Sequence, residues 1–206
     1  DIYSLSDPDL LAFLPRPIQA VILLFPVSEG YEKLMKKEEA LRTSALLHVN
    51  TTQDSELPSG FQPKTYKTEN NIFWLKQKIK NACGLYALLH VLMNLPNGLI
   101  VKDSVVSKLK GSLLNSSDAD AAKLIKEIGS SMHGEYAQQG QTEAPELGDE
   151  VDLHFLCFMK TDLGIVELDG RRNGPVVLQS GAVDEGEDII NSTVVIQRID
   201  KYMSLV

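Results

Sequence analysis

Three observations predict an α+β domain. Residues 84–93 are almost all apolar and good helix formers, which is typical of a buried helix. Residues 153–159 and 165–169 have the composition of two strands, and the turn-forming residues 160–164 between them predict a hairpin. Residues 18–25 form a third apolar segment, bounded by prolines, that we interpret as a buried strand. The chain has 206 residues, of which 43% are hydrophobic, enough for one domain with a sizeable core.

Further elements are expected on both sides of this central part. A short helix begins at Asp7-Pro8, and helices are expected over residues 28–37, 103–109 and 118–128, the last two each capped by an Asp. Residues 72–75 are predicted as an extended approach to the central helix. Two more strands are expected over 176–178 and 193–199, the second at the sheet edge. The polar stretch 43–67 is predicted as a surface loop or a disordered insertion, and residues 134–151 as a long loop, functional or disordered.

Composition narrows the class of partner. The net charge of −8 argues against nucleic acid and is compatible with a basic protein or peptide.

Two widely separated cysteines give neither a disulfide framework nor a zinc site, so a reducing cytosol is expected. The longest apolar run, residues 20–25, is far too short to span a bilayer, and no signal peptide is visible. The sequence begins with Asp1 instead of Met, which leaves open that it is a fragment or that a leader was removed.

Cys83 is a candidate nucleophile because it stands at the first turn of the predicted buried helix. Unpaired backbone N–H groups and the positive end of the helix dipole gather there, and both favour a thiolate. Gln77, six residues earlier, can supply an amide donor for an oxyanion. A structural buried cysteine is the alternative, and this stretch alone leaves both interpretations open.

A catalytic thiol needs a base nearby, and the sequence offers four histidines. His90 lies seven residues along the same helix as Cys83, about 10 Å away along the axis, and is excluded. His48 and His133 lie in polar segments without an evident carboxylate partner. These exclusions leave His154, which lies in an apolar strand.

Asp169 is the expected partner of His154. A hairpin centred between Thr161 and Asp162 places the two residues directly opposite each other, whereas a slip of the turn by one residue loses that pairing. A histidine in a strand is by itself more often a core residue. Its combination with a cysteine at a helix start follows the Cys–His–Asn/Asp logic of cysteine peptidases.

These residues resemble a known family. The pattern Gln77-x-x-x-Asn81-x-Cys83-Gly84, followed by His154 and the block 167–171 (Glu-Leu-Asp-Gly-Arg), is similar to the ubiquitin C-terminal hydrolases, the papain-like cysteine deubiquitinases. The opening residues 1–4 (Asp-Ile-Tyr-Ser) and 15–17 (Pro-Arg-Pro) also resemble that family, most closely its small fungal members.

The resemblance implies a fold and a set of roles. The fold is expected to be papain-like, with a central antiparallel sheet flanked by helices and a knotted backbone. Cys83 is implied to be the nucleophile, His154 the general base and acid, Asp169 the residue that orients the histidine, and Gln77 the oxyanion donor. By the same resemblance, residues 134–151 are expected to correspond to a crossover loop above the active site, which would limit substrates to ubiquitin carrying small or unfolded adducts. Acidic residues are our candidates for contact with the basic tail of ubiquitin: Glu143, Glu146, Asp149, Glu150 and Asp152.

The expected protein is therefore a thiol-dependent deubiquitinase that cleaves thioester, ester, amide and peptide bonds at the C-terminal glycine of ubiquitin. It is expected to need no cofactor or metal, to bind neither nucleic acid nor membrane, and to act as a monomer in the cytoplasm, with the nucleus as a second compartment. Residues 1–206 are expected to form one catalytic domain that lacks the family's usual N-terminal segment. Two alternatives are a ubiquitin-binding module with weak catalysis and a papain-like peptidase of other peptide tails.

Overall fold

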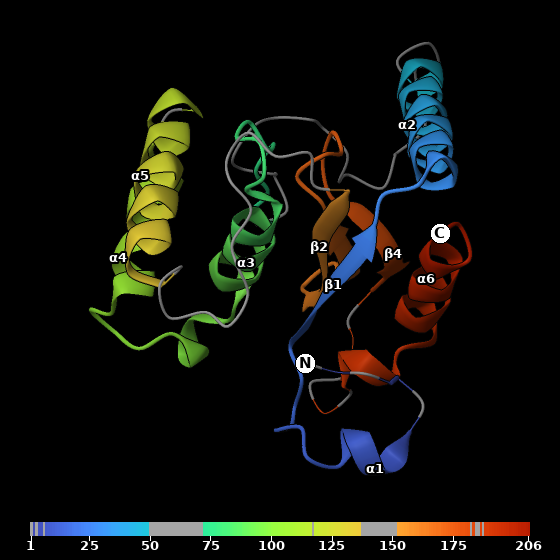
Figure 1. The fold of residues 1–206 in the computed structure, drawn as a ribbon, viewed down its shortest axis with the longest axis horizontal. Coiled ribbons are helices and arrows are strands. Elements are labelled where there is room, and N and C mark those ends of the chain that lie inside the picture. The colour runs from blue at the N-terminus through green and yellow to red at the C-terminus, as the bar shows by residue number, and fades with distance from the viewer. Residues whose placement is uncertain are drawn as a thin grey trace.

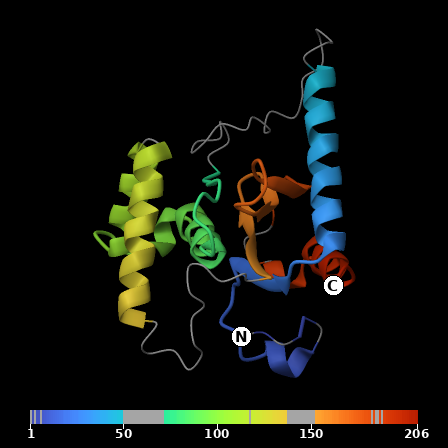
Figure 2. The ribbon, with the colours of Figure 1, turned by 45° about the horizontal axis from the view of Figure 1, so that its top comes forward.

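The architecture is α+β, as predicted. The structure, a computed structural model, describes residues 2, 4–5, 7–49, 72–116, 118–136, 152–181, 183, 186 and 188–206. A four-stranded antiparallel sheet in the order β1-β2-β3-β4 occupies the centre, with α3, α4 and α5 to one side and α2 and α6 to the other (Figure 1). The same arrangement is visible after rotation in Figure 2. The knotted backbone stays a prediction.

The strands are β1 (Ala20–Pro26), β2 (Leu153–Thr161), β3 (Gly164–Leu168) and β4 (Val176–Ser180). The expectation that the first strand is buried is only partly right, because β1 is an edge strand whose Ile22 and Leu24 are 42% and 46% exposed. Thr161 pairs with Gly164, so the β2–β3 turn lies one residue further along than predicted. Gly164 has a φ of 118°, a conformation that favours glycine and fixes the turn at this position.

Three helices begin or end at residues other than those predicted. The second helix, α2 (Glu29–Val49), follows α1 (Pro8–Leu11) and β1, and it extends into the predicted loop 43–67, whose remaining residues lie outside the described part. The helix α4 (Val105–Asn115) is capped by Ser104 instead of Asp103, which has a left-handed φ of 60°. The next helix, α5 (Asp118–Tyr136), covers the start of the predicted loop 134–151, and residues 137–151 are not described. Short 3₁₀ turns occur at η1 (Asn97–Leu99) and η2 (Ile189–Asn191).

The prediction of a strand over 193–199 is wrong, because these residues begin helix α6 (Thr193–Met203). The run of β-branched residues there has strand propensity, which tertiary packing overrides. Val195, Ile199 and Tyr202 are the buried residues of α6, and their spacing of four and three places them on one helical face.

The buried residues form two hydrophobic cores. The first joins the sheet to α2 and α6, and the second joins α3 (Cys83–Asn94) to α4 and α5. The extended segment 72–75 belongs to both, since Ile72 and Trp74 pack into the sheet core while Phe73 and Leu75 pack into the helical core. This alternation follows from the two-residue period of an extended chain.

Side chains of α3 hold the odd-numbered residues of this segment. Asn94 Oδ1 accepts from the N–H of Phe73 and Asn94 Nδ2 donates to its carbonyl, both at 2.7 Å. His90 Nε2 accepts from the N–H of Leu75 at 3.0 Å. His90 is fully buried, and its burial lowers the pKa of the imidazole to about 4. It is therefore a neutral structural residue, in agreement with its exclusion as the catalytic base.

Trp74 and the next even-numbered residue, Lys76, are bonded to the loop that follows β3. Trp74 Nε1 donates to the carbonyl of Asp169 at 3.0 Å, and Lys76 Nζ donates to the carbonyls of Arg171 and Arg172, both at 2.8 Å. The segment that leads to the candidate nucleophile therefore also supports the loop that contains the candidate carboxylate.

A buried ionic cluster fastens α2 and α6 to β3. Glu167 of β3 is fully buried and accepts from Arg172 Nε and Arg198 Nε, both at 2.7 Å. The hydroxyl of Tyr202 lies 2.8 and 2.9 Å from the two carboxylate oxygens of Glu167. Glu38 of α2 accepts from both arginines. Every charge in this cluster has an opposite partner, which buried charges need.

Candidate active site

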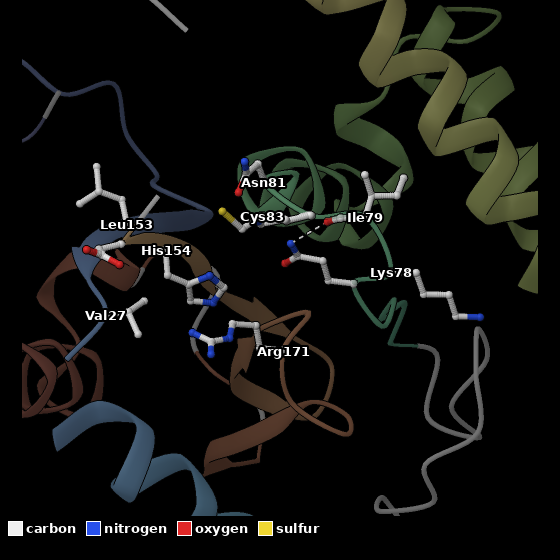
Figure 3. A pocket seen from close by; sticks show the side chains of 11 residues that line it. Val27, Lys78, Ile79, Asn81, Cys83, Leu153, His154 and Arg171 are labelled. Carbon is white, nitrogen blue, oxygen red and sulfur yellow. Dashed lines mark hydrogen bonds between the residues drawn. The ribbon is translucent and has the colours of Figure 1, made fainter. Parts of the chain in front are cut away.

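A pocket of about 430 Å³ lies between the start of α3 and the start of β2. Residues 77–81 and Cys83 line one side, and residues 152–154 with Val27 and Arg171 line the other. Cys83 and His154 face each other across it (Figure 3). The described part of the chain contains no cluster of metal-ligating side chains and no helix long and apolar enough to cross a membrane.

Cys83 is the first residue of α3, as predicted, and it is half-buried. Asn81, with a left-handed φ of 56°, turns the chain into the helix. Burial alone would raise the pKa of the Cys83 thiol, but hydrogen bonds with His154 and with the backbone of Phe155 and Gly84 outweigh it. The pKa of the Cys83 thiol is therefore lowered, which makes the thiolate easier to form than on an ordinary cysteine.

The imidazole of His154 lies between the thiol and a buried carboxylate. His154 Nε2 is 2.8 Å from Asp169 Oδ1, which leaves Nδ1 for Cys83. Burial acts to lower the pKa of His154, but the hydrogen bonds with Asp169 and Cys83 raise it to about 9. Burial acts to raise the pKa of Asp169, and the hydrogen bond with His154 brings it below its usual range. The three groups are therefore suited to a thiolate–imidazolium pair backed by a carboxylate.

The predicted contact of His154 with Asp169 is present, but the predicted pairing is wrong. The last β2–β3 pair is Cys157 with Leu168, so Asp169 lies just beyond the ladder. A turn that slips by one residue changes the pairing by two, which keeps both side chains on the same face. Asp169 is then the diagonal neighbour of His154, a separation that the two side chains span.

Asp169 has two further partners that the sequence did not indicate. Its Oδ1 also accepts from the backbone N–H of Arg171 at 2.8 Å, and its Oδ2 accepts from the hydroxyl of Tyr31 at 2.9 Å. Tyr31 comes from the first turn of α2, and nothing in the local sequence distinguishes it from an ordinary core aromatic residue. The Arg171 side chain forms an ion pair with Glu32, the next residue of α2.

Gln77 lies in the pocket wall with Cys83, and the loop after β3 holds its backbone. Its N–H donates to the carbonyl of Gly170 at 2.8 Å. Its side-chain Nε2 donates to the carbonyl of Ile79 at 2.9 Å, the dashed line in Figure 3. Its Oε1 is buried and has no hydrogen-bond partner among the residues that the structure describes. Since a carboxamide nitrogen has two hydrogens, one N–H remains uncommitted to Ile79.

Of the acidic residues proposed for substrate contact, the structure describes only Asp152. It is exposed and lines the pocket beside Leu153 and His154. The predicted contacts of Glu143, Glu146, Asp149 and Glu150 lie outside the described residues. His48 and His133 lie within α2 and α5, and the positions of their side chains are not described.

A thiol of lowered pKa and an imidazole line one pocket, and a buried carboxylate is hydrogen-bonded to that imidazole. This arrangement has the chemistry of a thiol hydrolase. The family comparison agrees with this class. The chain belongs to the ubiquitin carboxyl-terminal hydrolase family, family 1, whose model matches residues 1–204.

Individual relatives cover nearly the whole chain. It is 33% identical to the ubiquitin carboxyl-terminal hydrolase YUH1 of Saccharomyces cerevisiae, over 98% of this chain and 77% of that protein. It is 31% identical to the isozyme L1 of Macaca fascicularis, over 90% of this chain and 73% of that protein. Among solved structures, the Trichinella spiralis UCH37 catalytic domain bound to ubiquitin vinyl methyl ester matches with a TM-score of 0.57, 19% identity, and coverage of 98% of this chain and 75% of that one. This last likeness shows a shared fold.

Proposed function

We propose that this protein is a thiol-dependent deubiquitinase that hydrolyses thioester, ester, amide and peptide bonds at the C-terminal glycine of ubiquitin. The observation that carries the proposal is the hydrogen-bonded series of Cys83, His154 and Asp169, in which Cys83 and His154 line the pocket and Asp169 is fully buried. Family membership supports ubiquitin as the substrate, and the Trichinella neighbour was solved with a ubiquitin-derived probe.

The proposed reaction is acyl transfer in two steps. The Cys83 thiolate attacks the carbonyl carbon of the terminal glycine, and the backbone N–H of Cys83 with an N–H of Gln77 Nε2 stabilises the oxyanion. His154 donates a proton to the leaving group, so a thioester to Cys83 forms. His154 then takes a proton from water, the resulting hydroxide attacks the thioester, and the thiolate is released. Asp169 holds the imidazole in the required orientation throughout.

The decisive test is hydrolysis of ubiquitin carrying a C-terminal fluorogenic amide. The parent chain should turn over, and Cys83→Ala should abolish turnover. Cys157→Ala is the matched control, because Cys157 is fully buried and its burial raises the pKa of its thiol, so its loss should leave turnover in place. The rate should fall at alkaline pH with a midpoint near the His154 pKa of about 9, because the imidazolium is the acid for the leaving group.

Two other outcomes would replace the proposal. Tight binding of ubiquitin by a folded chain without turnover would indicate a binding module, and turnover of unrelated peptides at comparable rates would indicate a general papain-like peptidase.

We further propose that residues 1–206 form one catalytic domain that acts as a monomer in the cytoplasm and the nucleus. Light scattering of the purified chain tests the monomer.

We propose that Asp152 contacts the basic tail of ubiquitin, together with the four acidic residues named above. Asp152→Lys should raise KM several-fold and weaken its dependence on salt, since an attraction between opposite charges becomes a repulsion. Asp162→Lys is the matched control, because Asp162 is also exposed but lies in the turn at the far end of β2. An unchanged KM for Asp152→Lys would contradict the assignment. Adducts that are small or unfolded should be released faster than large folded ones.

A further inference from the structure

Asp169 uses its two carboxylate oxygens differently. Oδ1 faces the catalytic imidazole and also accepts the backbone N–H of Arg171. Oδ2 is the oxygen that the imidazole does not bond, and among the described residues its hydrogen-bond donor is the Tyr31 hydroxyl at 2.9 Å. The carboxylate is fully buried, so water does not replace a missing donor there. Whatever holds Oδ2 therefore also sets the rotation of the carboxylate and the direction of Oδ1.

Tyr31 is itself held firmly. Its side chain is fully buried, and its backbone N–H donates to Ser28 Oγ at 3.1 Å at the beginning of α2. Its ring packs edge-on against Phe25 and Tyr202, with ring centroids 4.8 and 5.3 Å away. A hydroxyl on such a ring has little freedom to follow a carboxylate that rotates, so the ring determines where Oδ2 lies.

We propose that Tyr31 is a positioning residue of the active site: its hydroxyl fixes Asp169 Oδ2 so that Oδ1 stays directed at His154. Tyr31 forms no hydrogen bond to Cys83 or His154 and acts through the carboxylate. Without this donor, Asp169 is free to rotate, the imidazolium loses part of its stabilisation, and the thiolate of Cys83 loses part of its own. The rate effect rests on the proposed function, whereas the effect on the thiolate does not.

The variant that tests this is Tyr31→Phe, which keeps the ring and removes only the hydroxyl. Tyr202→Phe is a closely matched control, because Tyr202 is equally buried in the same aromatic cluster but its hydroxyl bonds Glu167. Both variants remove one buried hydroxyl from a carboxylate, so both should lose stability in urea. Only Tyr31→Phe should change the chemistry of the site.

Three readouts separate positioning from stability. For Tyr31→Phe we expect kcat to fall roughly tenfold with KM nearly unchanged, and the alkaline limb of the pH–rate profile to move to lower pH. Thiolate formation, followed without substrate as the ultraviolet absorbance difference from the corresponding Cys83→Ala protein, should need a higher pH. Cys157 does not interfere, since both proteins contain it. Tyr202→Phe should match the parent in all three measurements.

The proposal is overturned if Tyr31→Phe has the parental thiolate titration, or if its titration and kcat change no more than those of Tyr202→Phe. If Tyr31→Phe does not fold, Ser28→Ala is the substitute, because it loosens the turn that holds Tyr31 while keeping the hydroxyl. It should raise the pH of thiolate formation in the same direction by a smaller amount, and an unchanged titration would again overturn the proposal. If the parent does not cleave ubiquitin, the proposed function fails, but the substrate-free titration still decides the role of Tyr31.

Discussion

Replacing Gly170 by alanine should damage the active site through one contact. A Cβ at position 170 would lie 2.9 Å from Gln77 Cβ and 3.2 Å from its backbone nitrogen. Ordinary van der Waals contact begins at 3.4 Å, so the two segments must separate by about 0.5 Å or more. Rotamer changes do not relieve this, because the contact is with Cβ and backbone. The hydrogen bond from Gln77 N–H to the Gly170 carbonyl, now 2.8 Å, would lengthen accordingly.

The magnitude follows from geometry. Overpacking typically costs about 1–3 kcal/mol of stability, and a displacement of about 1 Å at a catalytic group can cost about 100-fold in rate. A shift of half that size at Gln77 should therefore lower kcat roughly tenfold or more. The assays are hydrolysis of the ubiquitin amide and urea unfolding.

Gly111→Ala is the matched control. Gly111 lies in α4 with nothing within 4 Å of an added Cβ. Alanine there should keep the parental rate and gain up to about 1 kcal/mol, because alanine is the better helix former. A Gly170→Ala protein with parental kcat and parental stability would refute the reasoning, since the contact would then be accommodated without displacement.

Two predictions concern stability. The pKa of His90 is about 4 in the folded state and 6.5 ordinarily, so between these values the unfolded chain binds the proton and the folded chain does not. Stability should therefore fall by about 2 kcal/mol as pH drops from about 6.5 to 5, and His90→Gln, which can still bond Leu75, should flatten this dependence. Equal acid sensitivity of parent and variant in urea unfolding would contradict it. Arg172→Met should lower the free energy of unfolding by about 3–5 kcal/mol, because fully buried Glu167 then loses one of its cationic partners. Lys33→Met, which removes one partner of an exposed ion pair, should lower it by at most about 1 kcal/mol. Similar losses of stability for Arg172→Met and Lys33→Met would show that burial of the cluster does not matter.

Local patterns were sufficient for the elements on which the site is built. The buried helix after Cys83 and the apolar strands around His154 and Asp169 were predicted from periodicity and composition, and each is present. Their signals are strong because a long apolar run of good helix formers and a strand that is apolar on both faces leave few alternative conformations. The family resemblance then supplied the roles that these patterns leave open.

The failures share a physical cause, which is that tertiary contacts decide between local preferences. α6 is helical despite its β-branched residues because Val195, Ile199 and Tyr202 find a core on one face. The contact between Tyr31 and Asp169 joins residues 138 positions apart in the sequence, and no local pattern around either residue predicts it. The hairpin turn depended on one residue, Gly164, whose positive φ fixes a position that turn composition alone leaves ambiguous.

The shared segment 72–76 has a consequence for how this sequence can vary in length. Phe73 and Leu75 are bound by α3, whereas Trp74 and Lys76 are bound by the loop after β3. Deleting or inserting one residue would exchange the two sets, so the indole of Trp74 would enter the helical core and Phe73 would face the loop. The length of this segment therefore cannot change by even one residue without disrupting both sets of contacts. Neither half of the candidate active site can change its alignment along this segment without moving the other.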